Sequence, residues 1–191
     1  MTRWAVLYLR SRQVPGALGV LVLLTGLIGG LSWLSAGDIS QGPGVLVLAM
    51  GVAVMSVTLG PVDIDLERTA GFAWLPRRVV HVLLAGAMTI GVTAAMYLAL
   101  ADAVPGSSLL RNGIGLLGLA TFGVAVLGVR FGWALPIGWA ILAVFAPGDA
   151  GAVVRWPMEP VDAPSALVTA LVCGLLGAGS YAVSGARRVL A

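Results

Sequence analysis

Residues 61–78 read PVDIDLERTAGFAWLPRR and form the longest polar stretch in a chain of 191 residues that is 59% hydrophobic and only 10% charged. The stretch holds three acidic residues and three arginines between two long apolar runs. Asp63 is a suitable N-cap for a short helix, and Asp65 and Glu67 would follow in its first turn, where acidic side chains interact favourably with the helix dipole. Gly71 is a typical helix stop. We therefore expect a short helix within a connection between two apolar segments.

Such a helix, about seven residues long, is marginal on its own in water. It would persist only by docking on lipid headgroups, on the rest of the chain or on another protein. The stretch is therefore either an ordinary cytoplasmic turn between two membrane spans or a docking element for a soluble partner. Pro76 can open the helix that follows. Arg77 and Arg78 come directly after it and are expected at the membrane interface.

The composition excludes an ordinary soluble domain, because the mean hydropathy of the whole chain is +1.02. Apolar windows of about 17 to 25 residues recur along the sequence, which is typical of membrane-spanning helices. We expect an all-α polytopic integral membrane protein, folded as a single transmembrane domain over residues 1–191. The apolar runs predict six transmembrane helices, at residues 14–36, 43–62, 79–101, 113–129, 131–147 and 166–184.

The distribution of arginine predicts the topology. All eleven basic residues are arginine, and with six spans nine of them fall on one side of the membrane, whereas only Arg111 and Arg155 fall on the other. Positively charged residues gather on the cytoplasmic side. Both termini and the 61–78 loop are therefore expected in the cytoplasm of a multi-pass cell-membrane protein. Because the net charge of +3 comes from arginines that flank spans, we do not expect nucleic-acid binding.

Two further segments are expected at the membrane surface. Residues 1–13 place Trp4 on the same helical side as Leu7 and Tyr8, which favours a short interfacial helix over a frayed basic tail. Residues 146–165 form the predicted extracellular loop and contain four prolines, which disfavour a long straight helix. We expect a bent or partly re-entrant loop with Trp156 at the headgroup level.

The residue inventory excludes several chemistries. The chain has no lysine, so it holds neither a phosphate-binding Walker A loop nor a Schiff-base lysine. One histidine and one cysteine, His81 and Cys173, do not make a metal cluster of the usual spacing. We therefore expect no enzyme activity and no cofactor in this chain. The predicted spans also lack charged residues at their middles, which disfavours an ion-coupled carrier or a voltage sensor.

The glycines of the apolar runs include pairs spaced four apart, which can permit close helix packing. Such pairs are Gly26 with Gly30 and Gly128 with Gly132, while Gly174 pairs with Ala178.

The order of these segments resembles the membrane subunit of an ABC-2-type transporter. The shared features are an interfacial N-terminal segment, six spans with both termini inside, a helix-forming cytoplasmic loop after the second span and an outer loop before the last span. The chain departs from the family pattern because it lacks a large extracellular domain and almost nothing joins its fourth and fifth spans. The resemblance covers nearly the whole chain and is architectural.

The resemblance implies a permease subunit that exports a hydrophobic or amphiphilic compound. It would work as a homodimer or a heterodimer with a second permease in the lipid bilayer, with energy from a separate ABC ATPase subunit. The loop after the second span would then carry a coupling helix. Its apolar Leu66 would fill a shallow pocket of the ATPase, surrounded by polar contacts. The implied partner-coupling residues are Asp63, Asp65, Leu66, Glu67 and Arg68.

Other functions are open at this point. The runner-up is a non-transporting membrane scaffold or anchor protein that recruits partners. An ion-coupled carrier or channel and an intramembrane enzyme are further alternatives. A neighbouring reading frame that encodes an ATPase with a Walker A motif would favour the permease.

Overall fold

The computed structural model describes residues 2–36, 41–60, 74–100 and 106–187, and these residues form helices and turns without a strand. The predicted coupling residues, from Asp63 to Arg68, lie outside them. The α-helices are α1 Thr2–Ser11, α2 Val14–Ala36, α3 Gln41–Ser56, α5 Trp74–Leu100, α6 Gly106–Leu127, α7 Ala134–Phe145 and α8 Pro164–Ser184. Three short 3-10 helices accompany them: η1 Val57–Leu59, η2 Val129–Phe131 and η3 Trp156–Met158.

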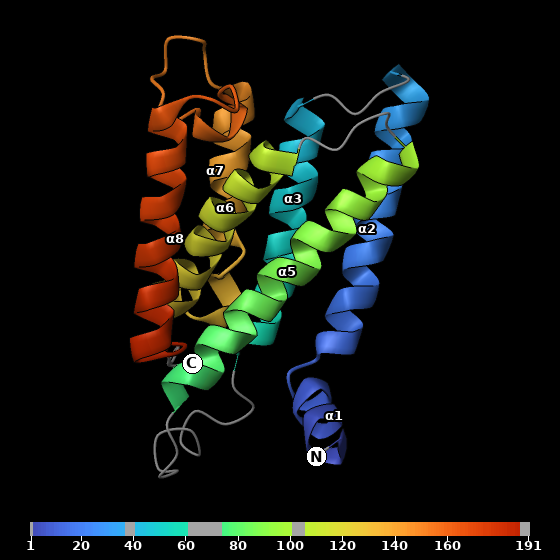
Figure 1. Cartoon of the computed structure of the whole chain (residues 1–191), viewed down its shortest axis with the longest axis vertical. Helices are drawn as coiled ribbons and strands as arrows, with labels where there is room; N and C mark the ends of the chain where they lie inside the picture. Colours follow the sequence, from blue (N-terminus) through green and yellow to red (C-terminus); the bar gives the residue numbers. More distant parts are fainter. Residues whose placement is uncertain (1, 37–40, 61–73, 101–105, 188–191) are drawn as a thin grey trace.

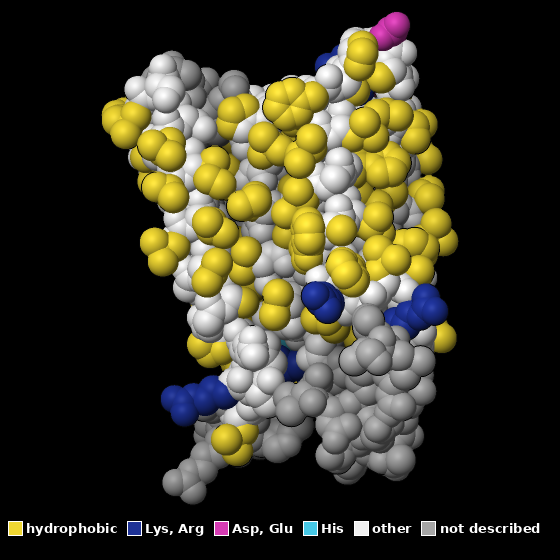
Figure 2. Space-filling model, turned by 180° about the vertical axis from the view of Figure 1, so that it is seen from behind, with side chains coloured by type: hydrophobic (Ala, Val, Ile, Leu, Met, Phe, Trp, Pro, Cys, Tyr) yellow, Lys and Arg dark blue, Asp and Glu magenta, His cyan; other side chains and the backbone are white. Residues whose placement is uncertain are grey.

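The helices confirm an all-α protein of the membrane class. Among the described residues, five helical segments are long and apolar enough to cross a membrane: α2, α3 continued by η1, α5, α6 and α8. Figure 2 shows hydrophobic side chains covering the middle of the molecule, while the charged side chains lie towards its two ends. This distribution fits a bilayer, because hydrocarbon favours apolar side chains and leaves charged ones at the interfaces.

Helix α3 lies at the centre of the bundle. Of its most apolar window, 72% is buried inside the protein, whereas the corresponding window of α2 is only 22% buried. α3 packs against α2, α5, α6 and α7, and Figure 1 shows it between α2 on one side and α6, α7 and α8 on the other. The main core cluster takes Val45, Leu48, Ala49 and Val52 from α3.

Helices α6 and α8 form the tightest pair, and glycines let their backbones meet. A Cβ atom added to Gly118 would collide with the backbone of Cys173 and Gly174, and one added to Gly177 would collide with the backbone of Gly118. Gly174 is itself packed against Ile114. At this contact no side chain larger than hydrogen fits without moving the helices apart.

Helix α7 is shorter than the predicted fifth span. Its 12 residues reach about 18 Å at 1.5 Å per residue, whereas the hydrocarbon core is about 30 Å thick. Pro136 does not interrupt α7. The chain instead breaks earlier, at Gly128 with φ 86° and through η2. α7 then starts at Ala134, so Pro136 lies in its first turn, where the missing N–H has no helical partner to lose.

The two ends of the bundle have different compositions. Figure 1 shows α1, the start of α5 and the ends of α6 and α8 at one end, which we name the arginine end after Arg12, Arg77, Arg78 and Arg187. The opposite end contains the start of α3, the end of α5, the start of α6 and the loop of residues 146–163. We name it the loop end.

Candidate functional site: a polar cavity at the loop end

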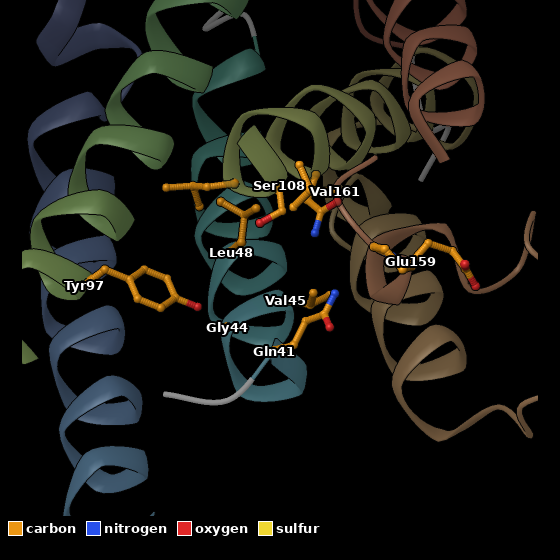
Figure 3. Close-up of a pocket in the computed structure, with 11 residues that line it drawn as sticks. Gln41, Gly44, Val45, Leu48, Tyr97, Ser108, Glu159 and Val161 are labelled. Atoms are coloured by element: carbon orange, nitrogen blue, oxygen red, sulfur yellow. The ribbon is translucent and has the colours of Figure 1, made fainter. Parts of the chain in front are cut away.

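A cavity of about 290 Å³ lies at the loop end between α3, α5, α6 and the 146–163 loop. Its wall combines aliphatic side chains with hydroxyl and amide groups. Figure 3 shows the Tyr97 hydroxyl and the Gln41 amide near α3, whereas the Glu159 carboxylate points away from the other lining residues. The lining residues are Gln41, Gly44, Val45, Leu48, Tyr97, Ser108, Leu109, Asn112, Glu159, Pro160 and Val161.

Tyr97 reaches the cavity because α3 has a glycine opposite it. A Cβ atom at Gly44 would collide with the Tyr97 hydroxyl oxygen, so any larger residue would displace the phenol. Tyr97 is buried together with Val47 and Met96 in a cluster between α3 and α5. The phenol ring is therefore held by apolar packing while its hydroxyl group lies against the backbone of α3.

Arg111 and Asn112 of α6 hold the part of the 146–163 loop that covers the cavity, here called its roof. The Arg111 guanidinium donates hydrogen bonds to the carbonyl oxygens of Pro160 at 2.7 Å and Glu159 at 2.9 Å, and to the Asn112 side-chain oxygen at 3.1 Å. The Asn112 amide donates to the Pro157 carbonyl oxygen at 2.9 Å. Both side chains are 4% exposed. A buried guanidinium is tolerated here because loop carbonyls satisfy its donors.

This arrangement differs from the predicted fourth span, which was expected to begin only at residue 113. Helix α6 begins at Gly106, so Arg111 and Asn112 lie inside it. The predicted absence of charge at the middle of the spans still holds for α6, because Arg111 lies near its first turns. The one signal of this buried polar site in the sequence is the Arg-Asn pair directly before an apolar run. Its carbonyl partners lie 45 to 49 residues further along the chain, which sequence reasoning did not connect.

The loop that roofs the cavity folds onto the bundle. Between α7 and α8 it contains turns and η3, as the four prolines predicted. Besides Arg111 and Asn112, two further side chains outside the loop hold it: the Gln41 amide donates to the Pro157 carbonyl oxygen at 3.4 Å, and the Trp139 indole donates to the Val154 carbonyl oxygen at 3.2 Å. The expected bent loop is thus present.

Trp156 corrects the expectation of a headgroup anchor. Its side chain is 0% exposed and belongs to the main core cluster. The ring lies against Gly115 of α6, where a Cβ atom would collide with it. The indole Nε1 has no hydrogen-bond partner among the described residues. The residue therefore attaches the loop to the core and does not present its ring to headgroups.

At the arginine end, arginine side chains cap the C-terminal ends of helices. The last carbonyls of a helix lack intrahelical donors and carry partial negative charge, so cations are favourable there. Arg12 donates to the carbonyl oxygens of Leu59 and Gly60 at the end of η1, Arg78 to those of Ala182 and Val183 in α8, and Arg187 to that of Val126 in α6.

Two other side chains join Arg12 at the end of η1. The Tyr181 hydroxyl from α8 donates to the Leu59 carbonyl oxygen at 2.6 Å. The His81 Nε2 atom from α5 lies 3.0 Å from the Thr58 carbonyl oxygen. His81 is 4% exposed, so it is a buried residue of the bundle. The chain thus leaves η1 for residues 61–73 from a point held by three other segments.

The remaining interfacial candidates are placed as follows. Arg77 lies at the start of α5 with its guanidinium 5.4 Å from the Trp74 ring centroid, and Arg78 caps α8 as described. Trp4 belongs to α1, but its side chain lies outside the described part of the protein. Both arginines lie in the first turns of α5, and the sequence did not predict their contacts.

The chemistry of the cavity suits binding. In the part of the chain that the structure describes, no three His, Cys, Asp or Glu side chains gather in a way that could hold a metal ion. The hydroxyl and amide groups of the wall can donate and accept hydrogen bonds, and the aliphatic side chains can cover apolar surface. Comparison with protein-family models, curated proteins and solved structures finds no match in any of the three. The family resemblance therefore stays a prediction.

Proposed function

We propose that the chain is a permease subunit of an ABC-2-like exporter in the cell membrane. It crosses the membrane six times, with α7 and the folded 146–163 loop together making the fifth crossing, and both termini are cytoplasmic. It works as a homodimer or a heterodimer with a second permease. A separate ABC ATPase supplies the energy to move a hydrophobic or amphiphilic compound.

One observation carries this proposal. Helices α3 and α5 line the polar cavity at the loop end, through Gln41, Gly44, Val45 and Leu48 of α3 and Tyr97 of α5. The same two helices flank residues 61–73 at the arginine end. A displacement applied to residues 61–73 would therefore act on the two helices that shape the cavity.

The hydrogen bonds at the end of η1 support this transmission. Arg12, His81 and Tyr181 tie that end to the α1–α2 connection, to α5 and to α8. Hydrogen bonds among buried groups hold helix ends in fixed relative positions. A force on residues 61–73 would thus move the joined helix ends together and would not be lost in local bending.

The cavity wall supports an amphiphilic substrate. Hydroxyl and amide groups from Gln41, Ser108 and Asn112 stand beside Val45, Leu48 and Leu109. Binding sites commonly combine an apolar wall with a few polar groups that orient the ligand. A compound with a neutral polar group and an apolar body matches this wall.

The test is co-purification of the full chain with a candidate ABC ATPase, such as one encoded in a neighbouring reading frame, followed by hydrolysis and transport assays. Leu66→Ala removes the predicted apolar anchor, and truncating a buried anchor costs about 2 kcal/mol or more in such interfaces. We expect weaker ATPase binding by about thirtyfold and hydrolysis that no longer drives transport. Leu34→Ala is the matched control, because Leu34 is 74% exposed on α2. The control should behave as the unmodified chain.

A second pair of changes separates an apolar contact from a charged one. Charge reversal of both Asp63 and Glu67 should weaken binding less than Leu66→Ala, and the effect should shrink at high salt because exposed charges are screened. If no ATPase co-purifies with the unmodified chain, or if Leu66→Ala and Leu34→Ala behave alike, the permease proposal is wrong. The scaffold alternative then takes its place.

A further inference from the structure

A second hollow lies at the arginine end, between α1 and the first turns of α5. It is a groove of about 450 Å³ lined by Tyr8, Leu9, Pro76, Arg77, Val80, His81 and Leu84. Its surface is almost wholly apolar apart from Arg77 and the polar edges of Tyr8 and His81. The groove is separate from the polar cavity, and His81 is the lining residue that it shares with the contacts at the end of η1.

One wall of the groove is a straight row along α5. Pro76, Val80 and Leu84 are spaced four residues apart, so they lie above one another on one helix face. Val80 is 54% exposed and Leu84 is 47% exposed. From Arg77 to Leu84 the helix rises about 10 Å, which is within the roughly 15 Å thickness of one hydrocarbon leaflet. The row therefore leads from the interface into the hydrocarbon.

The opposite wall is held in place by aromatic contacts. The Tyr8 ring packs edge-on against the His81 ring, with centroids 5.9 Å apart and an interplanar angle of 85°. The Arg12 guanidinium lies 5.4 Å from the Tyr8 ring centroid. Since Arg12 also holds the end of η1, the tyrosine is positioned by the bundle and the groove is formed before a ligand arrives.

The mouth of the groove carries positive charge. Arg77 is half-buried, with its guanidinium beside the Trp74 ring, and this stacking keeps the cation at the level where aromatic residues meet headgroups. A guanidinium matches a phosphate group in both charge and geometry. An apolar groove that starts at such a cation and runs into the hydrocarbon has the shape and charge of a lipid site.

We propose that this groove binds an anionic glycerophospholipid from the adjoining leaflet. One acyl chain lies along Val80 and Leu84, and the phosphate lies at Arg77. The site requires only that the protein is embedded in a bilayer, so it is independent of any role in transport. A zwitterionic lipid would place an acyl chain in the same groove, but it carries no net negative charge to attract it to Arg77. We therefore expect the groove to prefer anionic headgroups over zwitterionic ones.

The test uses the full chain in detergent, titrated with phosphatidylglycerol or phosphatidylcholine, with bound lipid counted by native mass spectrometry. We expect tighter binding of phosphatidylglycerol. One arginine near an anionic membrane surface contributes about 1 kcal/mol, so Arg77→Gln should reduce the preference about fivefold. Arg130→Gln is the control, because Arg130 is an exposed arginine that does not line the groove. It should leave the preference unchanged.

Variants that fill the groove test whether it binds the acyl chain of the lipid. Leu84→Trp should reduce binding of both lipids, whereas Leu83→Trp should not, because Leu83 is 64% exposed and lies outside the groove. Val80→Phe gives a second filling variant should Leu84→Trp fail to fold, as judged by helicity and size-exclusion profile. Equal binding of the two lipids to the unmodified chain overturns the proposal. So does an equal effect of Arg77→Gln and Arg130→Gln, or unchanged lipid binding when a folded variant fills the groove.

Discussion

The contact between Gly44 and Tyr97 shows at the residue scale how the cavity depends on one missing methyl group. The phenol hydroxyl occupies the place where a Cβ atom on α3 would lie. Gly42, one half-turn earlier on the same helix, has only ordinary contacts, the nearest being a Val144 methyl group at 3.6 Å. The two glycines therefore differ in what surrounds them, although both belong to the first turns of one helix.

Gly44→Ala should lower the free energy of unfolding by about 1–3 kcal/mol, the usual cost of overpacking, whereas Gly42→Ala should not. Because the clash is with the hydroxyl oxygen, Tyr97→Phe should recover most of the loss in the double variant. Thermal unfolding in detergent measures the unmodified chain, the two glycine variants and the Gly44→Ala/Tyr97→Phe double variant. A Gly44→Ala loss that Tyr97→Phe leaves unchanged would show that the clash lies elsewhere.

Arg111 has a different role at the same scale, since it joins α6 to the roof of the cavity. Arg111→Gln removes the donors to the carbonyl oxygens of Pro160 and Glu159. Hydrogen bonds from charged groups contribute about 1.5–3 kcal/mol, so the roof should open more often. We expect faster hydrogen exchange in residues 153–163 and a lower unfolding temperature. Arg130→Gln, at an exposed position, should change neither, and unchanged exchange in Arg111→Gln would contradict the role of Arg111.

At the element scale, the α6–α8 pair shows what glycine spacing does and does not predict. Gly174, part of one predicted pair, does pack against α6 at Ile114. Gly26 and Gly30, another predicted pair, have no atoms within 4 Å of an added Cβ. The closest approach involves Gly118 and Gly177, which the spacing did not mark. Spacing identifies a helix face that could pack closely, but it does not identify the helix that comes to meet it.

The corresponding prediction concerns Gly118→Ala and Gly177→Ala. Each added methyl group would meet the backbone of the facing helix, which cannot rotate away as a side chain can. We expect each variant to lose about 3 kcal/mol, the upper end of the usual overpacking range. Gly26→Ala should be neutral or stabilising, because alanine is the better helix former by about 1 kcal/mol. If the three variants unfold alike, the close α6–α8 contact is wrong.

Helix α7 shows that an apolar run does not by itself predict where a helix begins. The run of residues 131–147 was long enough to suggest a crossing, but hydropathy does not report where a backbone turns. Gly128 adopts a positive φ and η2 follows it, so the regular helix begins only at Ala134. In the irregular loop that follows α7, Trp156 and Pro157 are buried against the bundle, whereas Asp149 and Gly151 are exposed.

At the scale of the whole molecule, the sequence predicted the class well and the site poorly. Long apolar runs identify helices that can span a membrane without knowledge of neighbours, because the bilayer is the same solvent for each of them. The cavity instead needs Arg111 to meet carbonyls 48 and 49 residues away and Trp156 to enter the core beside Gly115. Such contacts depend on how helices pack, which no local pattern contains.

At the arginine end, too, the sequence predicted a general feature but not the individual contacts. Charge counting predicted that arginines would gather on one side, and the structure adds that several of them cap helix ends. Arg78 approaches Gly185, which has φ 69° and no room for a side chain beside the guanidinium. The gathering of arginines at one end thus coincides with a local structural role that stabilises the C-terminal ends of α6, η1 and α8.

The proposed function requires the polar cavity to face the outside while residues 61–73 face the cytoplasm. Cysteine labelling on intact cells tests this arrangement most directly, in a Cys173→Ala background that removes the one native thiol. Asp149→Cys places a thiol at an exposed position of the 146–163 loop, and Ala70→Cys places one in the stretch between η1 and α5. We predict that a membrane-impermeant maleimide labels the first in intact cells and the second only after permeabilisation. Labelling of both from the same side, or of Ala70→Cys alone from outside, would contradict the account.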